Sequence, residues 1–200
     1  MELVIFDLET TGLSPHGDEI IQIAAVRVRA GEVRAEESFA TFVDPGVGIP
    51  AFITHYTGIA DRHVRGAPRV VEALAAFSRF AGGATLVAHN GHRFDMPFIR
   101  AACERHALPT RAVPYADSVQ LSRRVWAGTR GHGLDAVIQR LGLDTGRWRR
   151  HDARGDVGIL AEAVTRMWRT LEPACRELPT RIHSGVLPAD GGVAGGTTAW

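Results

Sequence analysis

The sequence predicts an α/β protein in which helices flank a mixed sheet of five strands. Two observations lead to this prediction. The first quarter of the chain holds three short apolar segments rich in β-forming residues, separated by turn residues. Later strand-like segments alternate with segments of helical periodicity, which is the pattern of β-α-β units. An antiparallel meander followed by such units gives a sheet with both parallel and antiparallel neighbours.

The meander is expected at residues 2–7, 19–29 and 33–43. Its first segment, ELVIFD, is an apolar run short enough for a central strand. Gly, Pro and Asp residues in TTGLSPHGD mark the loop that follows it. Residues 30–32 (Ala-Gly-Glu) fit a hairpin turn between the second and third strands.

The rest of the chain is expected to alternate between strands and helices. Pro68 opens the first long helix as a first-turn proline, and the Gly82-Gly83 pair ends it. Pro114 favours an edge position for the fifth strand, because proline cannot donate a hydrogen bond to a ladder. The expected strands are 84–89 and 112–117, and the expected helices are 68–81, 94–107, 117–126, 133–142 and 154–171.

One domain is expected over residues 1–178, followed by a Gly- and Pro-rich tail at 179–200 that lacks periodicity and is expected to be disordered. Cys103 and Cys175 are interpreted as reduced, buried residues. The N-terminus shows no secretory signal, and no segment is apolar for long enough to cross a bilayer. These features predict a cytoplasmic protein without a membrane partner.

The charge of the chain is unevenly distributed. Residues 1–80 hold 7 Arg and 11 acidic residues, whereas residues 81–200 hold 16 Arg and 11 acidic residues. The segment 120–154 alone holds 8 Arg and 3 acidic residues. Such a basic band fits a polyanion held by its backbone. A solvated arginine surface is the alternative, since all 23 basic residues are Arg, which is typical of genome-wide compositional bias.

Asp7 and Glu9, in VIFDLETTG, lie two residues apart at the end of the first expected strand. Side chains at this spacing share a face, so both carboxylates point the same way. Two adjacent like charges are costly unless a cation bridges them. A solvated strand end with two acidic residues is the alternative for this pair taken alone.

Asn90, Phe94 and Asp95, in HNGHRFD, lie at a strand-to-helix turn, where sites occur in α/β sheets. Asp95 is expected in the first turn of its helix, where the helix dipole favours a negative charge. A purely structural role is also open, with Asp95 as a helix-start residue and Asn90 as a turn residue. Phe94 is assigned to core packing ahead of base stacking.

His151 and Asp156, in HDARGD, lie at the start of the last expected helix. If His151 precedes the first helical turn, it can lean over a site in which Asp156 binds a metal. Histidine is the natural general base near neutral pH. The alternative for His151 is a surface loop residue, and Asp152 is assigned to helix capping.

Together the three motifs resemble those of the DEDDh 3′→5′ exonucleases, a group that includes the proofreading epsilon subunit of bacterial DNA polymerase III. The first motif of the family, D-x-E, matches DLE, the second, N-x-x-x-[FY]-D, matches NGHRFD, and the third, H-x-A-x-x-D, matches HDARGD. The motifs are complete, in order and at family-like separations. The resemblance spans about residues 2–172 and implies an RNase H-like fold.

The resemblance also implies roles for the site residues. Asp7, Glu9 and Asp156 would ligate the first of two divalent cations, Mg²⁺ or Mn²⁺, and Asp7 would also hold the second. Asp95 would complete the site through water, and His151 would deprotonate the attacking water. The terminal nucleotide would bind at a set of residues near the first two motifs, namely Thr10, Thr11, Gly12, Leu13, Asn90 and Phe94.

The leading functional prediction is therefore a 3′→5′ exonuclease that releases nucleoside 5′-monophosphates from single-stranded 3′ ends, with DNA expected ahead of RNA. An RNA-trimming enzyme of the same family is the alternative within enzymes, because nothing in the sequence selects the sugar. A non-catalytic polymerase accessory module is the alternative from another class. A polymerase is a candidate partner, although the tail shows no clear clamp-binding peptide.

Overall fold

The computed structural model describes residues 1–144 and 153–189. Its strands are β1 Glu2–Thr10, β2 Ile20–Arg29, β3 Glu32–Phe42, β4 Thr85–Ala88, β5 Thr110–Asp117 and β6 His183–Pro188. Its helices are α1 Ala51–Thr57, α2 Asp61–Val64, α3 Val70–Ala81, α4 Asp95–Arg105, α5 Ser118–Val125, α6 Leu134–Leu141 and α7 Ala153–Leu171. Apart from β6 and the short helices α1 and α2, these elements lie close to the ones expected from the sequence.

The strands form one sheet in the order β3-β2-β1-β4-β5-β6. The pairs β1–β2, β2–β3 and β5–β6 are antiparallel, whereas β1–β4 and β4–β5 are parallel. The carboxyl ends of β1, β4 and β5 therefore lie along the same edge of the sheet, and the start of β6 joins them there. Loops at this edge are where α/β proteins place their functional groups.

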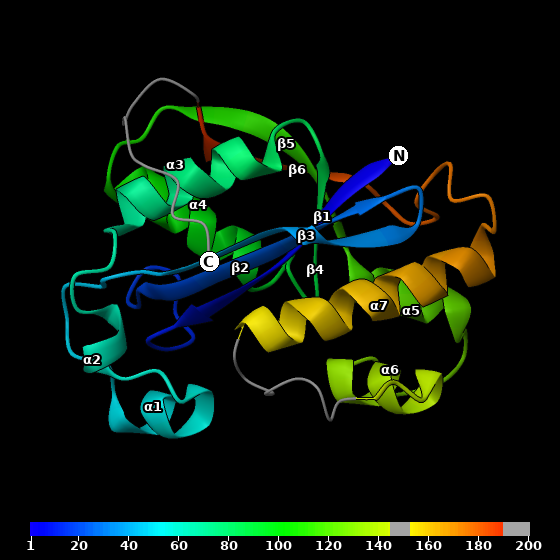
Figure 1. The fold of residues 1–200 in the computed structure, drawn as a ribbon, viewed down its shortest axis with the longest axis horizontal. Coiled ribbons are helices and arrows are strands. Elements are labelled where there is room, and N and C mark those ends of the chain that lie inside the picture. The colour runs from blue at the N-terminus through cyan, green and yellow to red at the C-terminus, as the bar shows by residue number, and fades with distance from the viewer. Residues whose placement is uncertain (145–152, 190–200) are drawn as a thin grey trace.

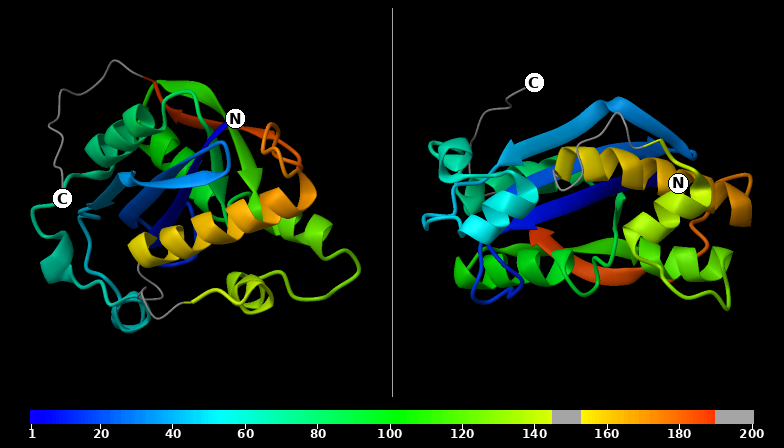
Figure 2. Two further views of the ribbon diagram at one scale, coloured as in Figure 1. Left: turned by 45° about the vertical axis from the view of Figure 1, so that its right-hand side comes forward. Right: turned by 90° about the horizontal axis from the view of Figure 1, so that it is seen from below.

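Helices cover both faces of the sheet (Figures 1 and 2). Strand β1 is buried on both sides, which explains its nearly continuous apolar run. Val4, Phe6 and Leu8 pack into the core cluster that α3 and α4 share with one face. Leu3 and Ile5 pack into the cluster that α5, α6 and α7 share with the other face. Both core layers thus hold the strand that carries the first motif.

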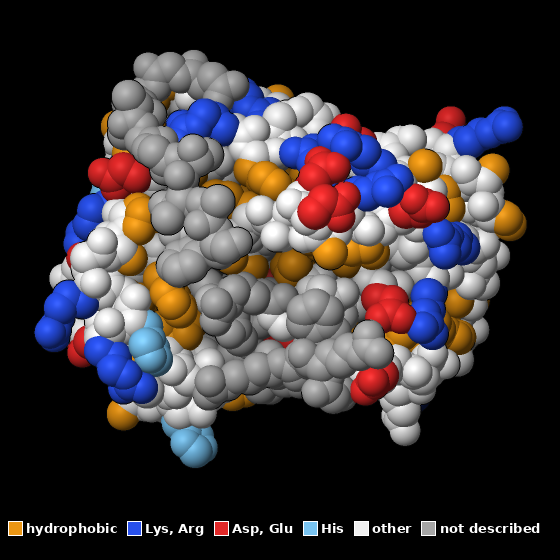
Figure 3. All heavy atoms as spheres, viewed as in Figure 1, with side chains coloured by type: hydrophobic (Ala, Val, Ile, Leu, Met, Phe, Trp, Pro, Cys, Tyr) orange, Lys and Arg blue, Asp and Glu red, His pale blue; other side chains and the backbone are white. Residues whose placement is uncertain are grey.

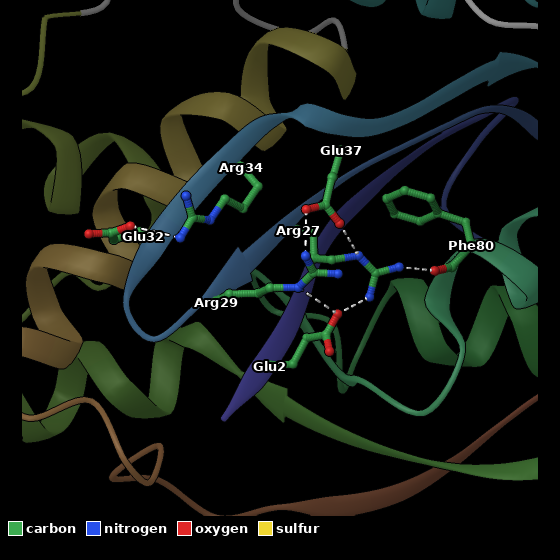
Figure 4. Close-up of polar contacts among 7 residues, drawn as sticks. All are labelled: Glu2, Arg27, Arg29, Glu32, Arg34, Glu37 and Phe80. Carbon is green, nitrogen blue, oxygen red and sulfur yellow. Dashed lines mark hydrogen bonds and ion pairs between the residues drawn. The ribbon is translucent and has the colours of Figure 1, made fainter.

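A network of charged side chains lies across the start of β1 and the β2–β3 hairpin (Figure 4). Arg27 and Arg29 each form ion pairs with both Glu2 and Glu37. Burial alone would raise the pKa of Glu2, but hydrogen bonds and charge from the two arginines lower it below its usual value. Acidic and basic side chains lie interspersed on this part of the surface (Figure 3). Because the two arginines and the two glutamates of the network compensate one another, they give this surface no excess of positive charge.

The structure corrects the expected strand count and the expected tail. A sixth strand, β6, forms at residues 183–188, within the segment expected to be disordered. Leu187 is fully buried, the Ser78 hydroxyl donates to the Pro188 carbonyl oxygen at 2.7 Å, and the Ala189 amide donates to the Pro109 carbonyl oxygen at 2.8 Å. Strand β6 forms because it pairs with the edge of β5 that faces away from β4. The composition of residues 183–188 alone did not reveal this partner. Residues 190–200 lie outside the described part of the chain.

The expected edge position of the fifth strand is also wrong, because β5 lies between β4 and β6. Pro114 pairs with Ser184 of β6, but β4 pairs with β5 only from Tyr115 onward. On its β4 side, Pro114 therefore precedes the ladder, and its missing N–H removes no hydrogen bond there.

Two further expectations can be compared with the described residues. Cys103 and Cys175 are free thiols, and both are buried. Burial raises the pKa of the Cys103 thiol to about 11, with a smaller contribution from the charge of Glu104. Across residues 1–144 and 153–189, the structure contains no helix with the length and hydropathy that a membrane span requires.

Candidate active site

Three carboxylates from the first and last motifs meet at the carboxyl end of β1. Asp7 and Glu9 point to the same side of the strand, because Leu8 between them turns into the opposite core layer. Asp156 lies in the first turn of α7, which packs on that same side. One carboxylate oxygen from each of the three residues lies within 4.8 Å of the others. This spacing allows all three to ligate one cation.

Packing of α7 against the sheet brings Asp156 to this position. Val157, Leu160 and Trp168 are buried in the core layer between α7 and the strands. The indole Nε1–H of Trp168 donates to the Glu177 carbonyl oxygen at 2.7 Å, which fixes the far end of the helix. Asp156 is 9% exposed, so its carboxylate is partly desolvated as well as close to two other acids. A bound cation would relieve both costs.

Asp95 approaches the site from the opposite core layer. It is the first residue of α4 and is buried, and its Oδ1 accepts a hydrogen bond of 3.2 Å from the backbone amide of Leu8. Leu8 lies between Asp7 and Glu9, so Asp95 is next to the carboxylate cluster without being one of its three closely spaced members. This placement is compatible with contact through water.

The pKa of Asp95 is strongly shifted by its surroundings. Its pKa is raised from 3.8 to about 7, chiefly by burial and to a smaller extent by the negative charge of Asp117, against the opposing effect of backbone hydrogen bonds from Asp95 and Leu8. A carboxyl group with this pKa is partly protonated near neutral pH. A nearby divalent cation would favour the ionised form.

The loop after β1 is held tightly beside the cluster. The Thr10 hydroxyl donates to the Gly12 carbonyl oxygen at 2.5 Å, and the Thr11 amide donates to the Glu19 carbonyl oxygen at 2.8 Å. A Cβ atom on Gly12 would lie 2.5 Å from the Asp18 carboxylate, so the loop has no space for a side chain there. Leu13 is 82% exposed at the tip. The loop thus presents backbone and one apolar side chain next to the acids.

Asn90 and Phe94 have clear structural roles in the described molecule. Asn90 has a φ of 61°, a left-handed conformation that asparagine tolerates better than most residues. Its carbonyl oxygen accepts from the amides of Arg93 and Phe94, which closes the turn before α4. The Phe94 ring packs against the ring of Phe98, with 4.9 Å between the two ring centroids. These contacts agree with the turn and core-packing interpretations of the two residues and leave substrate contact untested.

Asp117, at the end of β5, was missed as a site residue by sequence reasoning. Its carboxylate is buried and accepts hydrogen bonds from the amides of Asn90 (3.0 Å), His92 (3.2 Å) and Val119 (2.9 Å). Asp117 therefore caps α5 and holds the loop that carries Asn90 and Asp95. The Asp-Ser pair at the start of a helix is a capping signal that could have revealed the first role.

His151 and Asp152 lie outside the described residues, so the general-base and capping assignments for them remain predictions from the sequence. The described part of the site thus contains Asp7, Glu9 and Asp156 in one cluster and Asp95 beside it.

RNase H-like nucleases have this architecture: a central strand of a mixed sheet carries paired acids, and a long helix late in the chain places another acid beside them. The profile of the RNase T family, described as exonuclease, matches residues 4–164. The chain therefore belongs to the RNase T family of exonucleases. The family and fold predicted from the three motifs are confirmed.

Two relatives carry DNA polymerase III in their names. The chain is 44% identical over 140 residues to "DNA polymerase III PolC-type" of Streptococcus thermophilus, covering 70% of this chain and 9% of that protein. It is 43% identical over 175 residues to "DNA polymerase III subunit epsilon-like protein" of Rhodobacter capsulatus, covering 86% of this chain and 24% of that protein. The chain thus spans at most about a quarter of the length of these relatives.

Solved structures share the fold. The nuclease domain of 3′hExo, a DEDDh family member bound to rAMP, superposes with a TM-score of 0.74 at 19% identity, covering 92% of this chain and 96% of that one. Exonuclease X in complex with 5′ overhanging duplex DNA superposes with a TM-score of 0.65 at 24% identity, covering 84% and 92%. At these identities the likeness concerns the arrangement of helices and strands.

Proposed function

We propose that this chain is a 3′→5′ exonuclease that hydrolyses single-stranded DNA from its 3′ end and releases nucleoside 5′-monophosphates. The observation that carries the proposal is the cluster of Asp7, Glu9 and Asp156. Its three carboxylates come from two of the three motifs and lie close enough for shared ligation. The loop of the remaining motif reaches the same place through the Asp95–Leu8 hydrogen bond.

The donor set fits divalent cations that prefer oxygen. Carboxylates without histidine or cysteine ligands suit Mg²⁺ and Mn²⁺. We assign Asp7, Glu9 and Asp156 to a first ion, Asp7 also to a second, and Asp95 to contact through water. Two such ions supply charge stabilisation for the attacking and leaving oxygens of a phosphodiester.

The protein residues supply the other parts of the proposed reaction. His151 accepts the proton of the attacking water and passes it to solvent. The loop of Thr10 to Leu13 and the turn at Asn90 and Phe94 hold the terminal nucleotide, with exposed Leu13 against its base or sugar. Because Asp117 holds the Asn90 turn, the second motif is ordered before substrate arrives.

A labelled oligonucleotide digest tests polarity and metal use together. A single-stranded DNA 20-mer labelled at its 5′ end should yield a ladder that shortens from the 3′ end in Mg²⁺. The same DNA labelled at its 3′ nucleotide should release the labelled mononucleotide first. EDTA should stop both reactions. Release of the 5′ nucleotide first, or cleavage that persists in EDTA, would contradict the proposal.

Asp7→Asn is the variant that tests the cluster. It keeps the size of the side chain but removes the charge shared by both proposed cations, so cleavage should fall by at least about 10³-fold while the circular dichroism spectrum stays the same. Asp135→Asn, on the exposed side of α6, is the matched control. Near-normal cleavage by Asp7→Asn would refute the assigned role.

The same digest with matched RNA decides between the two sugars. Faster digestion of RNA would replace the proposed substrate with the alternative one. The names of the relatives support a replicative polymerase as partner, and co-purification with a replicative polymerase subunit of the same cell, before and after Asp7→Asn, would test binding separately from cleavage.

A further inference from the structure

Three aromatic rings cluster at the second motif, and they define what we term the aromatic ledge: His92, which lies within the motif, Tyr115 and His183. The His92 and His183 ring centroids lie 5.0 Å apart, and the Tyr115 and His183 centroids lie 5.1 Å apart. The angle between the planes is 33° for the first pair and 25° for the second. The His92 and Tyr115 centroids lie 6.1 Å apart, so each ring is close to the other two and the three form a compact cluster. The accessible side of such a cluster offers aromatic surface on which a nucleobase can stack.

The ledge is held in place by polar contacts and by β6. A ring nitrogen of His92, Nδ1, lies 2.6 Å from the Tyr115 hydroxyl, and Nε2 of His183 lies 3.2 Å from Nε2 of Gln120. Tyr115 is buried, His183 is half-buried, and His92 is exposed. Polar contacts therefore hold the cluster together, and His92 is its most exposed ring.

Gly185 explains how β6 can lie this close to the ledge. A Cβ atom at this position would collide with the Met96 methyl group and would lie 3.1 Å from the ring of Tyr115. The strand that carries His183 thus lies directly against the Tyr115 ring, with no side chain between them at this position.

Positive charge flanks the ledge. Arg100 of α4 and Arg181 before β6 are both exposed, and both are close enough for their charges to lower the pKa of Tyr115, against the larger effect of burial, which raises it. Burial, Arg181 and His92 lower the pKa of His183, against a smaller opposing effect of the Asp117 charge. Within residues 1–144 and 153–189, neither arginine forms an ion pair with an acid.

The ledge lies on the same edge of the sheet as the candidate active site. His92 is three residues before Asp95 in the loop after β4, and His183 is at the start of β6, opposite Tyr115. Three strand spacings separate β1 from β6, which is about 14 Å at about 4.8 Å per strand. Tyr115 packs in the layer of α3 and α4, whereas Asp156 belongs to α7 on the other side, so a bound single strand would pass along this edge from one side of the sheet to the other. A few nucleotides at about 3.4 Å each are long enough for such a path.

We propose that the aromatic ledge, together with Arg100 and Arg181, binds the single strand upstream of the 3′-terminal nucleotide. The exposed His92 ring stacks on a base a few nucleotides from the scissile bond, and the two arginines contact the phosphates beside it. The inference rests on the proposed function and adds a second binding surface outside the carboxylate cluster. It predicts that long substrates are held more tightly than short ones.

Two substrates that differ in length test this inference. The p-nitrophenyl ester of thymidine 5′-monophosphate occupies only the terminal position, whereas dT12 reaches the ledge. The ratio of kcat/KM for dT12 to kcat/KM for the ester is measured for the wild type, His92→Ala and the double variant His92→Ala with Arg181→Ala. Because stacking of one base contributes about 1–3 kcal/mol, the ratio should fall roughly tenfold in His92→Ala. It should fall further in the double variant.

Direct binding gives a second readout that does not need cleavage. The Kd of fluorescein-labelled dT12, measured by anisotropy in EDTA, should rise about tenfold in His92→Ala. In His92→Phe it should stay within about twofold of the wild type, since phenylalanine retains a stacking face. His106→Ala, an exposed histidine at the far end of α4, is the matched control and should change neither readout. Thermal melting of each variant excludes loss of fold.

The outcomes separate this inference from the proposed function. If the wild type hydrolyses neither substrate in Mg²⁺, the proposed function fails. If the wild type hydrolyses both, but His92→Ala and the double variant keep the wild-type ratio and Kd, the ledge does not bind the strand. If His92→Phe loses as much affinity as His92→Ala, stacking is not the mode of contact and the inference is equally overturned.

Discussion

Replacement of Asp95 by asparagine should stabilise the metal-free protein while abolishing its proposed activity. Asparagine has nearly the same shape, and its side-chain oxygen can still accept the hydrogen bond from the Leu8 amide. It lacks the negative charge that is costly in this buried position next to Asp117. The ionised Asp95 carboxylate thus destabilises the folded protein unless a cation is bound beside it.

The size of the effect follows from the pKa of Asp95, which rises from 3.8 to about 7 on folding. Between these two pH values the folded state binds more protons than the unfolded state, so the contribution of Asp95 to stability is greatest at low pH and is lost as the pH rises through about 7. Integrated from about pH 5 to about pH 8, the loss is about 3 kcal/mol. An asparagine side chain cannot titrate in this range, so the variant does not lose this part of the free energy of unfolding as the pH rises.

Urea unfolding in EDTA from about pH 5 to about pH 8 measures this difference. The free energy of unfolding of Asp95→Asn minus that of the wild type should increase by about 3 kcal/mol over the range. Taking the difference removes the titration of groups common to both proteins, such as Glu2. Glu36→Gln, which changes an exposed side chain of β3, is the control and should change the difference far less. A difference for Asp95→Asn that also stays flat, within about 0.5 kcal/mol, would refute the raised pKa.

Three other substitutions have defined outcomes. His151→Ala should lower kcat by roughly 10²–10⁴-fold with little change in the Mg²⁺ dependence, and a wild-type rate and pH profile would show that His151 is not the base. Asp117→Ala should destabilise the protein by about 2–4 kcal/mol, measured in urea, because it leaves three backbone amides without their acceptor. It should also slow cleavage more than Asp117→Asn does, and equal rates would argue against a loop-positioning role. Trp168→Phe should cost about 1–3 kcal/mol, since it leaves the Glu177 carbonyl oxygen unpaired and creates a cavity in a fully buried position. An unchanged urea midpoint would contradict this account.

The sequence was sufficient for most of the fold because its signals are local. The short apolar runs of the first strands, the turn residues between them and the apolar spacing in the last helix each depend on near neighbours. Strand β6 lacked such a signal: HSGVLP contains a glycine and a proline, and its pairing depends on an edge of β5 that is distant in sequence. The misplacement of β5 at the edge has the same cause.

The candidate site shows a similar division. The spacing of Asp7 and Glu9 indicated a shared face, and the motif order placed Asp156 with them, as the structure also does. The hydrogen bond between Asp95 and Leu8 could not be read from the sequence, because it joins residues 87 positions apart. Asp117 escaped notice for the same reason, since two of its three amide donors belong to the distant Asn90–His92 turn.

Acids reach the end of β1 from above and below the sheet, Asp156 with α7 on one side and Asp95 with α4 on the other. The place of Asp156 therefore depends on how α7 packs against the strand, and the place of Asp95 depends on α4 and on the hydrogen bond to the Leu8 amide. A substitution in one apolar layer that shifts one helix would move one acid and leave the other in place. Turnover in the proposed reaction should consequently respond to interior packing, with losses in rate that precede any measurable unfolding.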